Sequence, residues 1–177
     1  MKVSEQRGDV SNIVLIGMPG AGKSTVGIIL AKSASLGFID TDVLIQACEG
    51  RSLQSIVDSQ GYLALRRIEE RVLLGLGCRG HVIATGGSAV YSPAAMVHLA
   101  EGGRIVFLDV DLPTLESRSL DLGRRGIAKR PGQSFAELFA ERRGLYEAYA
   151  EVTIDCRGLT HDTVCTEILR RLQMFIV

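Results

Sequence analysis

Gly17-Met18-Pro19-Gly20-Ala21-Gly22-Lys23-Ser24 matches the pattern G-x-x-x-x-G-K-[ST] at every specified position. This stretch follows the short apolar run Asn12–Ile16 and precedes a helical pattern that starts at Lys23. A buried strand, a glycine-rich turn and a helix in this order direct backbone N–H groups and the positive end of a helix dipole at one anion. The sequence therefore predicts a loop that binds the phosphates of a nucleotide.

Each residue type in this loop has a chemical reason. Glycines allow backbone conformations, and a close approach to phosphate, that a side chain would block. Lys23 supplies a mobile cation to the β- and γ-phosphates, and the Ser24 hydroxyl takes one position on Mg²⁺. The residues of this segment that we expect to contact ATP are Gly17, Gly20, Ala21, Gly22, Lys23, Ser24 and Thr25.

Apolar runs alternate with helical patterns along the rest of the chain. Beyond 12–16, strands are predicted at 37–39, 81–85, 104–108 and 151–154, and helices at 23–33, 41–49, 62–78, 93–100, 112–119, 135–149 and 161–174. Strands that alternate with helices form right-handed crossovers and a parallel sheet. We expect an α/β fold of the P-loop NTPase type: a three-layer α/β/α sandwich with a five-stranded parallel sheet and a mobile lid.

Length and loop composition indicate the domain organisation. The 177 residues suffice for one hydrophobic core and are too few for two ordinary domains, so we expect one domain over 1–177. The stretch 120–134 is rich in glycine and in basic residues. Such a loop suits a mobile lid over a phosphate site, although a solvated connection is the simpler interpretation.

Charge and cysteine use limit the function classes. Lys plus Arg (20) equals Asp plus Glu (20), so the overall charge favours neither nucleic acid nor a membrane surface. The cysteines form no C-x-x-C pair and the histidines no H-E-x-x-H, which argues against zinc and for a reducing compartment. The first ten residues lack the order of a signal peptide. We expect a cytoplasmic monomer that binds a small-molecule substrate, and neither nucleic acid nor membrane.

Three classes of nucleotide-binding protein share the phosphate loop. A signalling GTPase needs the guanine-reading N-K-x-D, and Asn12 is the only asparagine in the chain. The quartet Asp58-Ser59-Gln60-Gly61 fits a switch D-x-x-G but does not follow a buried strand. An assembly ATPase would use a Walker-B aspartate, for which Asp109 is the candidate. A small kinase needs a base and anion-binding arginines, and the remaining motifs favour this class.

Two carboxylates, Asp40 and Asp42, follow the predicted second strand, at the sheet edge where ligands bind in open α/β folds. Alternate residues of an extended segment point the same way, so Asp40 can serve Mg²⁺ while Asp42 faces an acceptor hydroxyl. The alternative interpretation is that the pair caps the helix from Val43. Arg66 and Glu69 share one helix face, where the carboxylate can orient the guanidinium toward a substrate carboxylate.

The order of these motifs resembles the shikimate kinase family from Ile13 to about Leu172. The resemblance rests on the segments 17–25, Asp40-Thr41-Asp42, 65–70, Ala84-Thr85-Gly86-Gly87 and 141–146. It implies an enzyme that uses ATP and Mg²⁺ to phosphorylate a hydroxyl of shikimate, giving shikimate 3-phosphate. It also implies an acceptor-binding region at about 33–62.

The resemblance implies roles on the acceptor side. Asp42 binds the acceptor hydroxyl and is its base, while Arg66 and Arg142 hold the carboxylate. Gly86 and Gly87 let the backbone approach the ring. The acceptor contacts that we expect are Asp42, Arg66, Gly86, Gly87, Ser88 and Arg142.

The resemblance also implies roles on the nucleotide side. Ser24 and Asp40 serve Mg²⁺, and Arg118 lies near the adenine. The lid arginine falls at Arg125 when it is spaced without gaps from Arg118, and Arg130 before a proline is the competing choice. Lys23, Asp42 and Arg125 are therefore the expected catalytic residues.

Three positions depart from the family pattern. Ser88 stands where the family has a third glycine, Gly144 where it has a proline, and Arg125-Gly126-Ile127 where it has Arg-Pro-Leu. All three changes lie on the acceptor or lid side, so the prediction of a kinase is firmer than that of shikimate. A hydroxy amino acid or a sugar acid as acceptor, or a nucleotide-binding module without kinase activity, are the alternatives.

Overall fold

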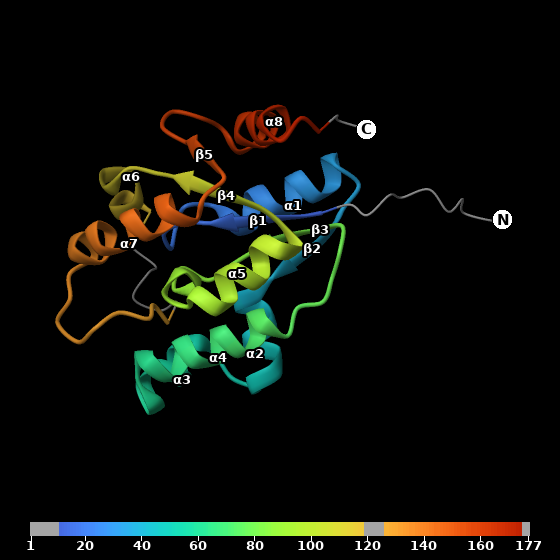
Figure 1. Ribbon diagram of the computed structural model, residues 1–177. Coiled ribbons are helices and arrows are strands. Elements are labelled where there is room, and N and C mark those ends of the chain that lie inside the picture. The colour runs from blue at the N-terminus through green and yellow to red at the C-terminus, as the bar shows by residue number, and fades with distance from the viewer. Residues whose placement is uncertain (1–10, 119–125, 175–177) are drawn as a thin grey trace.

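The structure is a computed structural model that describes residues 11–118 and 126–174. Its centre is a parallel sheet of five strands in the order β2-β3-β1-β4-β5 (Figure 1). Leu15 of β1 pairs with Ala84 of β3 on one side and with Val106 of β4 on the other. The strands are β1 Asn12–Ile16, β2 Gly37–Asp40, β3 His81–Ala84, β4 Gly103–Asp109 and β5 Val152–Asp155.

Helices cover both faces of the sheet, as the α/β/α sandwich requires (Figure 1). Helices α1 and α8 pack against each other on one face, and α5 and α7 lie on the other. Helices α2, α3 and α4 gather beside the β2 edge. The helices are α1 Lys23–Ser33, α2 Thr41–Glu49, α3 Leu53–Gln60, α4 Tyr62–Leu74, α5 Pro93–Gly102, α6 Leu112–Ser117, α7 Phe135–Tyr149, α8 His161–Arg171 and the 3-10 turn η1 Ala89–Tyr91.

The hydrophobic core has two parts. The larger part surrounds β1, whose five residues are all buried because β1 is the central strand of a covered parallel sheet. The smaller part lies between α2, α3 and α4 and includes Ala128 from the segment 126–134. Residues 126–134 are therefore anchored by an apolar contact, although they form neither helix nor strand.

The structure corrects three details of the sequence-based elements. Helix α3 was not predicted, and it contains most of the quartet Asp58-Ser59-Gln60-Gly61, so that quartet is no switch loop. Its eight residues are held at the start by Ser52, whose hydroxyl accepts the Ser55 N–H at 3.2 Å. Helix α4 ends at Leu74 rather than at 78, because Gly75 closes it with hydrogen bonds to preceding carbonyls. The turn η1 was also missed.

The predicted lid falls partly outside the described residues. Arg125, with the rest of 119–125, belongs to that part, so its assignment stays a prediction. Within 11–118 and 126–174, no helix combines the length and apolar character that a bilayer crossing demands.

We predict that Gly103→Ala destabilises the fold. Gly103 pairs with Asn12 in the sheet, and an added Cβ would lie 2.5 Å from the Asn12 carbonyl oxygen. Overpacking of this kind costs about 1–3 kcal/mol, measurable as a lower free energy of unfolding in urea. Gly102→Ala is the matched control, because its nearest atom would be 3.6 Å away. Equal stability of the two variants would contradict the prediction.

Candidate functional site

The phosphate loop joins β1 to α1 as the sequence predicts. Gly22 is the N-cap of α1 at φ 90°, a left-handed conformation that favours glycine. A Cβ on Gly17 would lie 2.9 Å from the Leu108 carbonyl oxygen, so the turn also needs glycine for close packing. The loop backbone is thus fixed by conformation at one end and by the β4 strand at the other.

Lys23 folds back over this loop. Its Nζ donates to the carbonyl oxygens of Gly17 at 2.7 Å and Met18 at 2.9 Å. Burial lowers the pKa of Lys23 to about 8, against the opposing effect of the Asp42 carboxylate. The ammonium is therefore still protonated at neutral pH. The loop carbonyls hold it beside the turn that we expect to bind the phosphates.

Ser24 and Asp40, the two expected magnesium ligands, are neighbours. The Ser24 hydroxyl donates to Asp40 Oδ2 at 2.5 Å. The other oxygen, Oδ1, accepts the N–H groups of Asp42 at 3.0 Å and Val43 at 3.3 Å, which caps α2. The alternative interpretation of a helix cap is thus right for Asp40, and its other oxygen binds the Ser24 hydroxyl.

Asp42 faces the loop after β3. Burial, partly offset by Lys23, raises the pKa of the Asp42 carboxyl. A Cβ on Gly86 would lie 2.7 Å from Asp42 Oδ1 and would overlap Glu69 Oε1. The Gly86 N–H donates to the Thr41 hydroxyl at 3.0 Å, which fixes this close approach. The missing side chain of Gly86 therefore makes room for the carboxylates of Asp42 and Glu69.

Glu69 does not hold Arg66, contrary to the expectation from their spacing. The carboxylate is buried and accepts a hydrogen bond on Oε2 from the Ser88 hydroxyl. Its other oxygen, Oε1, has no hydrogen-bond partner within the described part of the chain. Burial and the nearby Asp42 raise the pKa of Glu69 to about 7. Position i+3 on a helix brings two residues to one face, but tertiary packing gives Glu69 a different partner.

Arg66 and Arg142 converge on a single atom. Each donates from NH2 to the Ala128 carbonyl oxygen, Arg66 at 3.4 Å and Arg142 at 2.8 Å. Arg142 is fully buried, yet among residues 11–118 and 126–174 its Nε and NH1 have no hydrogen-bond partner, and neither has Arg66 Nε. Buried guanidinium N–H groups without acceptors are costly, so these atoms are free to bind an anion.

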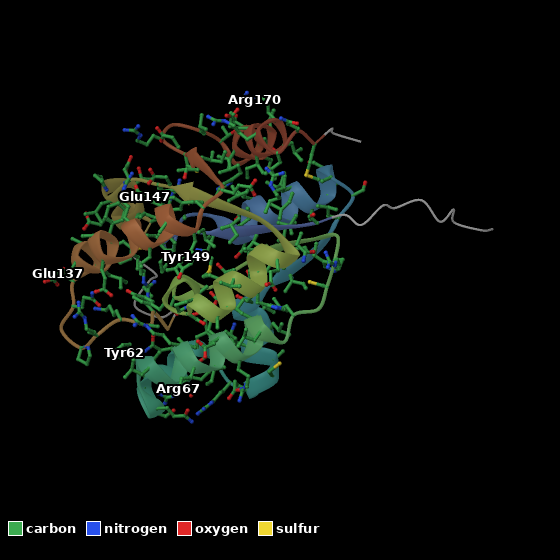
Figure 2. All side chains as sticks on the ribbon, in the orientation of Figure 1. Tyr62, Arg67, Glu137, Glu147, Tyr149 and Arg170 are labelled. Carbon is green, nitrogen blue, oxygen red and sulfur yellow. The ribbon has the colours of Figure 1, made fainter. Side chains whose placement is uncertain are left out.

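An aromatic side chain packs on Arg66. The Arg66 guanidinium carbon lies 3.4 Å from the ring centroid of Tyr91 and 5.1 Å from that of Tyr62 (labelled in Figure 2). The Tyr91 hydroxyl donates to Glu141, which also forms an ion pair with Arg130 at 2.7 Å. Arg130, the competing choice for the lid arginine, is thus engaged with Glu141.

The phosphate loop, Asp42, Glu69 and Arg142 border one cavity of about 380 Å³. Arg118 and His161 line the cavity next to the phosphate loop. Arg118 NH1 donates to the Gly20 carbonyl oxygen at 3.2 Å, and the His161 ring packs beside Gly22. The sequence-predicted residues that line the cavity are Gly20, Gly22, Lys23, Ser24, Thr25, Asp40, Asp42, Gly86, Gly87, Ser88, Arg118 and Arg142. The phosphate loop and the acceptor residues therefore share one site.

Some residues lie differently from the sequence-based expectations. Arg66 donates a hydrogen bond to Ala128 but does not line the cavity. Gly17 and Ala21 of the phosphate loop do not line it either. Asp109, the Walker-B candidate, forms an ion pair with Arg143 at 2.7 Å away from the cavity lining. Gly144 is exposed on α7, where an added Cβ would meet nothing within 4 Å. This departure from the family pattern therefore leaves the cavity unchanged.

Sequence reasoning missed several site residues. Thr41 was treated only as a spacer between two aspartates, and Glu69 only as a partner of Arg66. Ala128 and His161 carried no signal, because an apolar residue in a loop and a histidine that begins a helix are common. Tyr91 lay in a stretch with no predicted element. Only the folded arrangement brings these side chains to the cavity or to its arginines.

Comparisons with known proteins agree with this geometry. The family model described as shikimate kinase matches residues 19–173. The shikimate kinase of Persephonella marina is 32% identical over 92% of this chain and 99% of its own, and that of Mycobacterium tuberculosis 36% over 91% and 93%. A solved shikimate kinase from Acinetobacter baumannii, in complex with shikimate, superposes with a TM-score of 0.86 at 29% identity, covering 93% of both chains.

We predict that Arg66 and Tyr91 stabilise each other. A guanidinium stacked on a partly desolvated ring contributes about 1–2 kcal/mol, so the double-mutant cycle of Arg66→Met and Tyr91→Leu should give a coupling of that size in urea unfolding. Arg67 on the exposed side of α4 supplies the control, since Arg67→Met should be additive with Tyr91→Leu (Figure 2). Additivity in both cycles would show that the contact contributes no stability.

Proposed function

The chain belongs to the shikimate kinase family, and on that premise we propose that it transfers the γ-phosphoryl group of ATP to a hydroxyl of shikimate, giving shikimate 3-phosphate. One observation carries the proposal. The unpartnered N–H groups of the buried Arg142 lie beside the same cavity as the phosphate loop. A small acid held by that guanidinium would therefore lie within reach of a bound nucleotide.

The nucleotide would bind at the start of α1. Its phosphates would lie against the loop N–H groups, with Lys23 as the cation that faces the β- and γ-phosphates. Arg118 and His161 border the cavity beside Gly20 and Gly22 and would contact the rest of the nucleotide. We extend this proposal to Arg125 as the lid arginine, because Arg130 is already engaged with Glu141.

Ser24 and Asp40 would hold Mg²⁺. Their oxygens lie 2.5 Å apart at the phosphate loop, and hard oxygen donors are the ligands that Mg²⁺ prefers. No group of three potential metal-binding side chains occurs among residues 11–118 and 126–174. That fits an ion bound by one or two protein oxygens together with phosphate and water. When bound, Mg²⁺ supplies charge neutralisation to the phosphates.

The acceptor would be held by its carboxylate and deprotonated at its hydroxyl. The carboxylate would bind Arg142 through Nε and NH1, which have no protein acceptor, and would compete with the Ala128 carbonyl for NH2. Asp42 faces the cavity between this arginine and the phosphate loop, so it would accept the hydroxyl proton as transfer proceeds. Catalysis would come mainly from positioning and charge neutralisation.

The other parts of the proposal come from the sequence. We propose a monomer that works in the cytoplasm and binds neither nucleic acid nor membrane. Balanced charge supports the part on nucleic acid and membrane, because 20 basic and 20 acidic residues leave no net cationic character.

A panel of acceptors tests the substrate. With Mg-ATP present, ADP release in a coupled assay should depend on added shikimate and should not respond to gluconate, homoserine or nucleoside monophosphates. Dependence on another member of the panel would keep the kinase and replace shikimate. ADP release that no acceptor stimulates would favour a nucleotide-binding module.

We predict that Arg142→Met raises the KM for shikimate about ten- to a hundred-fold and leaves the KM for ATP nearly unchanged. The reason is that a hydrogen bond to a charged group contributes about 1.5–3 kcal/mol. Arg143→Met is the matched control, because Arg143 pairs with Asp109 and Glu147 instead of facing the cavity. Arg66→Met serves if the buried variant does not fold. A raised KM for ATP with an unchanged KM for shikimate would place these arginines in the nucleotide site.

A further inference from the structure

Ser88 is a departure from the family pattern that lies inside the cavity and adds a hydroxyl there. It follows Gly86 and Gly87 at the end of β3, lines the cavity and is only 7% exposed. Its hydroxyl donates to Glu69 Oε2 across 19 positions of the chain. A glycine at this position could not make that hydrogen bond, so the contact is a property of this chain.

The second oxygen of Glu69 has no hydrogen-bond donor among the residues that the structure describes. Glu69 Oε1 is buried and lies beside Gly86 and Asp42, at the wall of the same cavity. A buried carboxylate oxygen that lacks a donor is destabilising, so the site is incomplete without one. Its position at the wall makes a ligand the natural source of that donor.

The charged groups around Glu69 leave room for this ligand. Asp42 faces it from α2, Lys23 from α1 and Arg142 from α7. Lys23 Nζ is already bound to the carbonyl oxygens of Gly17 and Met18, and Asp42 lacks a proton to donate when it is ionised. A neutral hydroxyl of a ligand satisfies Oε1 without adding charge to this crowded site.

We propose that Ser88 is a positioning residue of the acceptor site: it holds one oxygen of Glu69 so that the other accepts a hydrogen bond from an acceptor hydroxyl. This inference rests on the proposed function. A polyhydroxylated acid suits the site, because Arg142 receives the carboxylate, Asp42 one hydroxyl and Glu69 another. Acceptors that lack this second hydroxyl would lose the contact with Glu69.

The proposal has a consequence for pH dependence. Burial and Asp42 raise the pKa of Glu69 to about 7, while the Ser88 hydrogen bond, Arg142 and Lys23 act in the opposite direction. The ionised carboxylate is the stronger acceptor, and it prevails only above that pKa. Removal of the Ser88 hydroxyl raises the pKa of Glu69 further, so less of the ionised form is present at neutral pH.

Kinetics of Ser88→Ala test the proposal. Near pH 9 the ratio of wild-type to variant kcat/KM for shikimate should stay above one, because Glu69 is no longer held in place. At pH 6 the ratio should be about tenfold larger than at pH 9, because a lost hydrogen bond also displaces the pKa by about one pH unit. In a Glu69→Gln background, Ser88→Ala should have no further effect on this profile. Thr166→Ala, which removes a hydroxyl from the exposed side of α8, is the control and should match the wild type.

Two results would overturn the proposal: a ratio that is the same at every pH, including a ratio of one throughout, or an unchanged effect of Ser88→Ala in the Glu69→Gln background. A ¹³C NMR titration of the Glu69 carboxyl in the ligand-free protein decides the same point without an acceptor. Its midpoint should rise by about one pH unit in Ser88→Ala, and a fixed midpoint would also overturn the proposal. Wild-type protein that does not phosphorylate shikimate would contradict the proposed function alone, since the NMR titration still decides the role of Ser88.

Discussion

Three buried charged side chains and one half-buried carboxylate surround one cavity, and this burial constrains the whole site. Lys23, Asp42, Glu69 and Arg142 come from α1, α2, α4 and α7, and each loses most of its contact with water. An isolated buried charge is very costly, so two cations and two carboxylates must lie close enough to compensate each other. Compensation is incomplete, because several polar atoms of Glu69 and Arg142 lack partners. The arrangement is therefore suited to bind a ligand that completes it.

The backbone between these charges is as constrained as the charges themselves. Gly86 lies against Asp42 and Glu69, and a Cβ on Gly87 would lie 2.8 Å from Arg142 NH1. The Thr41 hydroxyl accepts the Gly86 N–H, so a hydrogen bond joins the end of β3 to the start of α2. Because β3 pairs with both β1 and β2, the end of β3 and the start of α2 are also held next to the phosphate loop that follows β1. Small residues at these positions let four helices direct charged groups at one point.

Much of the fold and part of the candidate site could be predicted from the sequence. The phosphate loop, the five parallel strands and most helices follow from motif, apolar runs and helical periodicity. Helix α3 escaped prediction because an eight-residue helix has few periodic positions and its start depends on a Ser52 cap. The pairing of Arg66 with Glu69 was predicted wrongly because spacing on a helix says which residues share a face, and tertiary packing chooses the partner.

The sequence by itself determined that a nucleotide loop joins a buried strand to a helix, since that motif is local and its residues touch one another along the chain. It also determined which arginines and aspartates could serve an acceptor. Only the tertiary structure decided that Glu69 binds Ser88, that Arg66 stacks on Tyr91, and that Ala128 meets both arginines. These contacts join residues 14 to 62 positions apart, and their geometry depends on how the helices pack on the sheet.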